Sequence, residues 1–174
     1  MSGAYYTARY ACPVGGLVLA AGGEALCGLW LEGQKYFGGG LVDGAVPGDD
    51  LPVFAQARDW LDRYFAGTRP DPRELPLAPV GGAFRQAVWK LLLEIPYGQT
   101  VTYGELARWI AAQRGLASMS AQAVGGAVGH NPISIIIPCH RVVGTGGSLT
   151  GYAGGVDKKR WLLAHEGVDI SRLR

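Results

Sequence analysis

The amino-acid sequence predicts an α+β protein of two lobes, an N-terminal β-meander with one helix packed on a mainly helical C-terminal lobe. Short apolar runs separated by glycine and proline turns fill residues 6–31, which is typical of a meander. Apolar residues recur at helical spacing from residue 52 and again after residue 81. Four prolines lie between these regions, at positions 70, 72, 76 and 79. We therefore predict lobes over residues 1–78 and 79–174.

The elements of the first lobe follow from local patterns. Alternation over residues 6–10 predicts a first strand, a turn follows at Pro13, and residues 17–20 and 26–31 predict two further strands. Residues 38–50 are rich in glycine and acidic residues and are predicted to form a loop. A helix then begins near Pro52, with Asp50 as its cap. We expect its apolar face to pack on the sheet rather than bind a ligand; the face consists of Val53, Ala57, Trp60, Leu61 and Tyr64.

The second lobe opens with a predicted helix over residues 84–95. Thr102 and Glu105 have the spacing of a capping box and start another helix, which runs to about Ala112. Ser120 caps a short helix over residues 121–128, so the two helices form a helix-turn-helix-like pair. The apolar run 133–137 predicts a buried strand, and Asp157 caps a last helix that ends near Glu166.

Composition and charge narrow the classes of protein. The chain has 174 residues, 48% of them hydrophobic, which suffices for an ordinary core. No stretch approaches the ~20 apolar residues that cross a bilayer, and residues 1–10 lack the order of a secretory signal. We therefore expect a cytoplasmic protein without a membrane partner. Residues 1–80 carry six basic and nine acidic residues, whereas residues 81–174 carry ten and five, which suits a polyanionic partner.

The cysteines are Cys12, Cys27 and Cys139, an odd number at wide spacing, which excludes a disulfide framework. They form no close cluster with the three histidines, so we expect neither a metal nor another cofactor. A metal site built from Cys12, Cys27 and a distant histidine is left open by spacing alone.

Cys139 is the candidate nucleophile. It follows Pro138, which ends the apolar run, and it precedes His140 and Arg141, residues that can lower the pKa of a thiol. Adjacent residues of a regular strand point to opposite faces, so contact between Cys139 and His140 would need a turn or a bridging water. The residues alone therefore leave two readings of Cys139 open, a reactive thiol and a small buried hydrophobe.

A run of ordered motifs settles the choice between them. Residues 137–142, Ile-Pro-Cys-His-Arg-Val, resemble the active-site motif of the O6-alkylguanine-DNA alkyltransferases, the methylated-DNA–protein-cysteine methyltransferases. Further similar motifs stand in the same order at residues 103–107, 123–127, 131–132, 151–152 and 162–167. The resemblance covers residues 81–170 strongly and the first lobe more loosely. It implies a winged helix-turn-helix-like DNA-binding element in the C-terminal lobe.

The resemblance also implies a reaction. Cys139 would take the alkyl group irreversibly from O6-alkylguanine, and from O4-alkylthymine, after the base is flipped out of double-stranded DNA. His140 would act as base through a water molecule, and Glu166 would orient it. Tyr103 would serve the ring nitrogen of the departing base, and Asn131 would brace the turn before the cysteine.

The residues that the resemblance places against the DNA or the base are Ala121, Gln122, Ala123, Gly125, Arg141, Val142, Tyr152 and Ala153. Small residues allow the short helix to approach the minor groove closely. Gln122 stands where familiar members carry an intercalating arginine, so we expect an altered flipping step. Ala153 stands where most carry serine, so only a main-chain donor remains there.

Two other classes of protein compete with this interpretation. A cysteine hydrolase using Cys139 and His140 would turn over repeatedly, whereas an alkyltransferase works once. A damage-sensing DNA binder without catalysis carries tryptophan in place of the cysteine, and Cys139 argues against it. We expect a monomer. The sequence leaves open the range of alkyl groups, the preference between guanine and thymine, and cooperativity along DNA.

Overall fold

The computed structural model describes residues 5–149 and 151–174. Contacts between Cα atoms divide the chain into two compact units. The first runs to Val80 and includes Pro132–Ile136; the second consists of Gly81–Asn131 and the chain from Ile137 onward. The sequence-based lobes differ from this division in leaving Pro132–Ile136 with the second lobe. In the described part of the chain no helix has the length and apolar character needed to cross a membrane.

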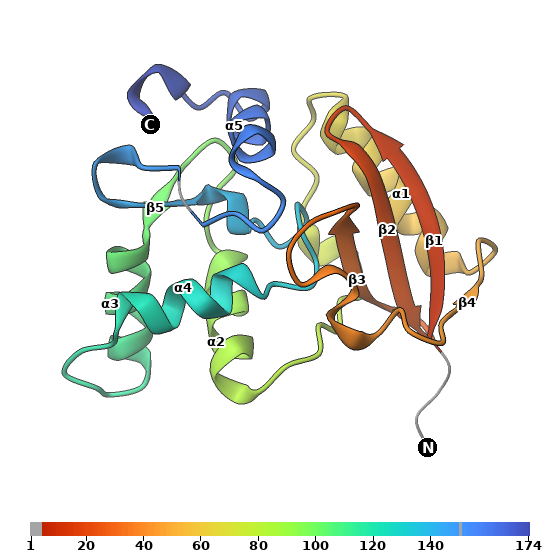
Figure 1. The fold of residues 1–174 in the computed structure, drawn as a ribbon, viewed down its shortest axis with the longest axis horizontal. Coiled ribbons are helices and arrows are strands. Elements are labelled where there is room, and N and C mark those ends of the chain that lie inside the picture. Colours follow the sequence, from red (N-terminus) through yellow and green to blue (C-terminus); the bar gives the residue numbers. More distant parts are fainter. Residues whose placement is uncertain (1–4, 150) are drawn as a thin grey trace. The chain divides into compact units, whose positions relative to one another are not determined.

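The first unit contains the predicted β-meander. Strands β1 (Tyr6–Cys12), β2 (Gly15–Gly22) and β3 (Ala25–Leu31) pair antiparallel in sequence order, as Figure 1 shows. A fourth strand, β4 (Val46–Pro47), pairs parallel with β1 and completes the order β3-β2-β1-β4. The meander is confirmed, and β4 lies in the segment that we predicted as loop.

Helix α1 (Pro52–Phe65) packs against strands β1, β2 and β3 of this sheet (Figure 1), and its five predicted core residues are all buried. Trp60 and Tyr64 stack with ring centroids 5.6 Å apart, and Trp60 Nε1 donates to the Asp71 carbonyl at 2.9 Å. The prediction of Asp50 as cap is wrong: Leu51 occupies the N-cap with no side-chain hydrogen bond. Pro52 lies at the start of the helix, where its fixed φ favours helix initiation without a capping side chain.

The predicted strand over residues 133–137 is also wrong. Only Ile133 forms a bridge, with Leu29, where Leu29 N donates to the Pro132 carbonyl and Ser134 N donates to the Leu29 carbonyl. Ile135 then has a φ of 71°, and Ile136 N bonds back to the Ser134 carbonyl at 2.8 Å. The run is buried as expected, but its backbone groups bond in a tight turn. An apolar run alone does not distinguish a strand from buried irregular chain.

The described residues of the second unit form the α-helices α2 (Ala83–Leu92), α3 (Tyr103–Gln113), α4 (Ala121–Gly129) and α5 (Val156–His165). Short strands β5 (Val101–Thr102) and β6 (Val142–Val143) pair in parallel. Helix α2 ends three residues earlier than predicted, and Ile95 is buried in the turn that follows. Helices α2, α3 and α4 lie together in Figure 1, and Trp89 Nε1 of α2 donates to the Ala127 carbonyl of α4 at 2.9 Å.

Two of the three N-cap residues predicted for helices of the second unit are confirmed. Thr102 Oγ1 accepts from Glu105 N at 3.1 Å, and Ser120 Oγ accepts from Ala123 N at 3.2 Å, as predicted. Asp157 was expected to cap α5, but Gly155 occupies the N-cap, and Asp157 lies within the first turn. A carboxylate there still complements the positive end of the helix dipole. Helices α3 and α4, joined by residues 114–120, form the predicted helix pair.

Candidate functional site

Cys139 lies on a turn rather than on a strand. Pro138 has φ −82° and ψ 65°, and Cys139 N donates to the Ile137 carbonyl at 2.8 Å, which together define an inverse γ-turn. Residues Cys139–Arg141 then form one turn of 3₁₀ helix. On a strand the side chains of Cys139 and His140 would point to opposite faces. Because both residues lie in a turn, this restriction does not apply to them. The thiol is buried, with 6% of the residue exposed.

Asn131 braces this turn. Its Nδ2 donates to the Ile137 carbonyl at 2.9 Å, and its side chain also hydrogen-bonds to the thiol of Cys139. Burial raises the pKa of Cys139 above its usual value, although Asn131 and the positive charge of Lys159 act in the opposite direction. The resting thiol is therefore protected from ionisation by burial, and two neighbours favour the thiolate.

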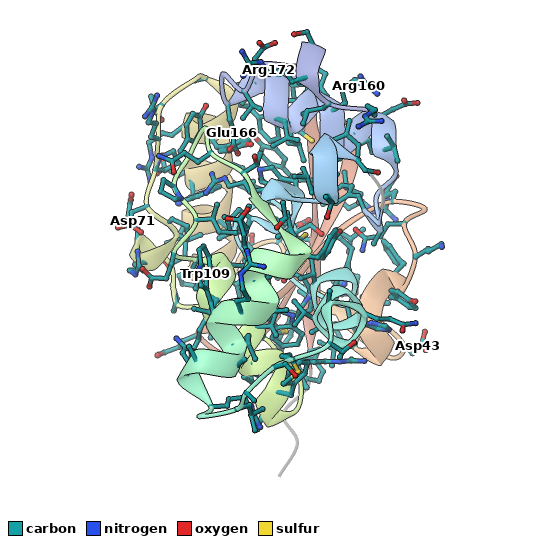
Figure 2. All side chains as sticks on the ribbon, turned by 90° about the vertical axis from the view of Figure 1, so that its left-hand side faces the viewer. Asp43, Asp71, Trp109, Arg160, Glu166 and Arg172 are labelled. Atoms are coloured by element: carbon teal, nitrogen blue, oxygen red, sulfur yellow. The ribbon has the colours of Figure 1, made fainter. Side chains whose placement is uncertain are left out.

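Glu166 is the centre of a buried hydrogen-bond network. His140 Nε2 donates to Glu166 Oε2 at 2.6 Å, and Arg141 binds both carboxylate oxygens, at 2.7 and 3.1 Å. Arg141 also donates to the Ile95 carbonyl at 2.6 Å, and Gly98 N donates to Glu166 Oε1 at 3.3 Å. Figure 2 shows Glu166 inside the second unit, whereas the labelled Arg172 reaches outward, its side chain 88% exposed.

The charges of this network follow from burial and partners. Burial lowers the pKa of His140 despite the attraction of Glu166, so the imidazole is neutral. Burial alone would raise the pKa of Glu166, but His140 and Arg141 outweigh it and hold the carboxyl ionised. His140 therefore carries its proton on Nε2. Its Nδ1 is buried and finds no hydrogen-bond partner among residues 5–149 and 151–174.

Tyr103 begins α3 and faces two glycines. A Cβ on Gly125 of α4 would lie 3.7 Å from the Tyr103 ring, and a Cβ on Gly151 would lie only 2.8 Å from its hydroxyl oxygen. Gly151 also has a φ of +87°, which favours glycine. Burial, assisted by the charge of Cys139, raises the pKa of Tyr103 to about 12. The phenol is therefore a proton donor at neutral pH, beside the nucleophile.

Sequence reasoning missed Lys159. This α5 residue is completely buried, its Nζ donates to the Val142 carbonyl at 2.5 Å, and it lies 5.9 Å from the centroid of the Tyr103 ring. Burial lowers the pKa of Lys159 to about 8, although the negative charge available on Cys139 raises it. Its helical spacing from Leu162 and Leu163, both buried, was the available signal that the lysine faces inward.

The residues predicted to bind DNA or the base separate into two groups. Ala121, Gln122 and Ala123 are exposed on the first turn of α4, whereas Gly125, Tyr152 and Ala153 are half-buried. Arg141 and Val142 differ from both groups. Both side chains are buried, and the guanidinium of Arg141 is occupied by Glu166 and Ile95. Arg141 binds Glu166, and Val142 contributes its carbonyl to Lys159; a role of either residue in binding DNA or the base stays a prediction.

Cys12 and Cys27 belong to the first unit. Cys12 Sγ donates to the Gly15 carbonyl at 3.1 Å, and Cys27 is buried with Ala20 and Trp30. No group of three or more histidine, cysteine, aspartate or glutamate side chains that could hold a metal occurs in the described ranges of the chain.

Family comparisons agree with the motifs. Residues 5–79 match the model of the 6-O-methylguanine DNA methyltransferase ribonuclease-like domain. Residues 83–168 match that of the 6-O-methylguanine DNA methyltransferase DNA-binding domain. Together the two models span most of the chain.

Individual proteins resemble the chain over nearly its full length. A methylated-DNA–protein-cysteine methyltransferase of Haemophilus influenzae is 44% identical over 97% of this chain and 89% of its own length. One from Mycobacterium bovis is 46% identical over 88% of this chain and 87% of its own. Among solved structures, Mycobacterium tuberculosis OGT in complex with DNA superposes with a TM-score of 0.78 at 44% identity, over 97% of this chain and 94% of that one.

Proposed function

The chain belongs to the 6-O-methylguanine DNA methyltransferase family, and on that premise we propose that it repairs DNA by direct reversal, moving an alkyl group from O6 of guanine to Sγ of Cys139. The observation that carries this proposal is the convergence of a buried thiol, a neutral imidazole and a phenol in one unit. These groups provide a nucleophile, a base and an acid, which are the three that an alkyl transfer to sulfur requires.

The reaction is a single displacement. His140 takes the thiol proton through a bridging water, because Nδ1 is the free acceptor of a ring whose Nε2 is held by Glu166. The thiolate attacks the alkyl carbon, the carbon–oxygen bond breaks, and its electron pair passes to the base. Tyr103 gives its proton to the ring nitrogen of that base. The thioether has no easy route to hydrolysis, so each molecule acts once.

Double-stranded DNA is the proposed partner, with O4-alkylthymine as a second substrate. Between Glu105 and Asp157 the sequence carries no acidic residue, and this stretch contains α3 after its first turn, all of α4 and the Cys139 turn. The exposed start of α4 presents the small side chains of Ala121 and Ala123, which permit close approach to a groove. The target base is flipped out of the stack, and Gln122 fills the space that it leaves.

Residues 79–174 carry the chemistry and the DNA contacts, and residues 1–78 form a structural lobe. Tyr152 and the main chain at Ala153 cover the flipped base. The protein acts as a monomer without cofactor. These assignments rest on the position of each residue in the family's motifs and on the geometry of the second unit.

Intact-mass measurement tests the function. Incubation with an excess of duplex DNA containing O6-methylguanine is expected to add one methyl group per protein molecule, located on Cys139 by peptide mapping. Cys139→Ser is the matched control and should gain no mass. Release of more than one equivalent of repaired guanine per protein would instead identify a turning-over hydrolase. Repetition with bulkier O6 adducts and with O4-methylthymine defines the substrate range.

A further inference from the structure

The segment that follows α5 folds back onto the loop that follows β6. We call residues 168–174 the strap and residues 144–149 the β6 loop. Arg174 N donates to the Gly147 carbonyl at 2.9 Å, and Leu149 N donates to the Arg174 carbonyl at 2.8 Å. Figure 1 shows the dark-blue end of the chain beside this lighter blue loop. Arg174 therefore holds the β6 loop through both of its backbone groups.

Apolar side chains reinforce these hydrogen bonds. Three partly buried residues of the strap pack against a buried cluster from β6, the β6 loop and α5. The strap residues are Val168, Ile170 and Leu173, and the cluster consists of Val143, Leu149 and Leu163. The strap also has local structure of its own, because Asp169 caps a turn of 3₁₀ helix by accepting from Ser171 N at 3.1 Å.

The backbone of the strap lies directly on Gly147. A Cβ on Gly147 would be only 2.7 Å from the Arg172 carbonyl oxygen, and its φ of +82° also favours glycine. Gly146 has a similar φ of +73°, but a Cβ there would meet the guanidinium of Arg174, with Nη2 at 3.0 Å. That group is the far end of a flexible side chain. Close approach to the backbone of the strap therefore distinguishes Gly147 from its neighbour.

The β6 loop leads into residues 151–153, which we call the lid because Tyr152 and Ala153 are proposed to cover the flipped base. The strap fixes Leu149, which is 1% exposed. Gly151 lies two residues further along, where a Cβ would be 2.8 Å from the Tyr103 hydroxyl. Two residues of extended chain span at most about 7 Å, so the position of Leu149 limits where the lid can lie.

We infer that the strap positions the lid for the alkylated base, with Leu173 and Arg174 as positioning residues. This inference rests on the proposed function and deepens it. A lid that is held in place before the base arrives loses less conformational freedom on binding, which strengthens binding. The strap thus contributes to the binding of the base, whereas the reactivity of the thiol depends on the groups around Cys139.

Two alkyl donors separate these contributions. The free base O6-benzylguanine must occupy the base pocket before its benzyl group passes to Sγ of Cys139 and guanine leaves. Iodomethane methylates the same thiol without any base. Intact-mass measurement gives the rate of each reaction, and the ratio of the two rates reports on the pocket separately from the thiol.

Gly147→Ala directs a methyl group at the strap. The displaced strap should release the lid, so the reaction with O6-benzylguanine should slow at least about tenfold while the reaction with iodomethane does not slow. Gly146→Ala is the matched control, because it carries the same backbone strain and the Arg174 side chain can move away. Equal rates in the two variants, or equal slowing of both donors in Gly147→Ala, would overturn the inference.

Arg174→Pro weakens the strap without adding a group to the β6 loop. Proline lacks the N–H that binds the Gly147 carbonyl, and Leu173, with φ −98° and ψ 149°, already has a conformation that suits the residue before proline. Loss of this hydrogen bond should slow the reaction with O6-benzylguanine about three- to tenfold. Arg174→Ala keeps the N–H and should react like the unaltered protein. Equal rates for Arg174→Pro and Arg174→Ala would contradict the inference.

The unaltered protein separates failure of this inference from failure of the proposed function. If iodomethane methylates Cys139 but O6-benzylguanine does not react, the proposed function is wrong and the inference falls with it. If O6-benzylguanine reacts and neither Gly147→Ala nor Arg174→Pro slows it, the inference alone is wrong.

Discussion

Glu166 shows how a single residue can organise the chemistry of its neighbours. It follows the last residue of α5, where a carboxylate opposes the helix dipole, yet it is ionised because Arg141 binds both of its oxygens. In return it fixes the tautomer of His140 by accepting from Nε2. The unfavourable position relative to the helix is therefore offset by two buried partners.

Removal of the charge on Glu166 should destabilise the fold and slow the transfer. In Glu166→Gln the guanidinium of Arg141 stays buried without a counter-charge, which costs about 3–5 kcal/mol. Denaturant unfolding measures this loss, and single-turnover kinetics on O6-methylguanine DNA measure the rate. Glu94→Gln is the matched control on an exposed carboxylate and should change stability by less than about 0.5 kcal/mol. Equal stabilities of the two variants would show that the network is energetically neutral.

Individual residues also show where sequence reasoning succeeds. Thr102, Ser120 and Asn131 act within about six residues along the chain, so their local spacing predicts their hydrogen bonds. Lys159 and Arg141 are different, because the Val142 carbonyl and Glu166 lie 17 and 25 residues away from them. No local pattern encodes such contacts. From the sequence, a charged residue is expected to be exposed to solvent. Only the folded structure shows that these two residues are buried.

At the scale of elements, the Cys139 turn and α4 position the reacting groups. The meander and the buried helix faces were predictable from the sequence. Apolar residues that recur every second position in a strand, or at helical spacing in a helix, lie on one face, and that face is buried. The segment 133–137 was not, since its backbone closes a turn at Ile135 with positive φ, which β-branched residues rarely adopt. The roles of the site residues rest on the family motifs and remain predictions.

The loop at Gly151 should be intolerant of a side chain. In Gly151→Ala the new Cβ would meet the Tyr103 hydroxyl at 2.8 Å, so the phenol must move and alkyl transfer should slow at least tenfold. Gly155→Ala separates this clash from backbone strain, because Gly155 also has positive φ but a Cβ there meets nothing within 4 Å. Each variant should lose about 1–3 kcal/mol of stability from strain. Similar transfer rates for both would contradict the proposed contact.

The first turn of α4 carries the next prediction. Gln122→Arg adds a planar cation to an exposed position of this helix, so it should tighten binding to duplex DNA and speed transfer from O6-methylguanine. Gln113→Arg adds the same charge at the exposed end of α3 and serves as control. Fluorescence anisotropy at several salt concentrations measures affinity. Unchanged affinity and rate in Gln122→Arg would remove Gln122 from the flipping step.

At the scale of the whole molecule, the buried histidine should make the stability of the protein decrease in acid. His140 is held neutral by burial, with its pKa below the usual value of about 6.5 that the unfolded chain retains. As pH falls below that value, the unfolded state binds a proton that the folded state refuses, so stability must fall. From pH 7 to pH 5 this one group should remove up to about 2 kcal/mol. Glu166, whose pKa is strongly lowered, stays ionised throughout this interval.

Comparison with His140→Gln isolates that contribution. Glutamine can still donate to the carboxylate of Glu166 but cannot titrate, so its unfolding free energy should decline less between pH 7 and pH 5 than that of the unaltered protein. Urea denaturation at half-unit pH intervals gives the unfolding free energy of each protein as a function of pH. The contributions of all other ionisable groups cancel in the difference between the two curves. Parallel curves would show that the pKa of His140 is the same in the folded and the unfolded protein, which would contradict the shift by burial. A smaller decline in the unaltered protein than in His140→Gln would show that folding raises this pKa, and the base in the proposed reaction would then have to be a different group.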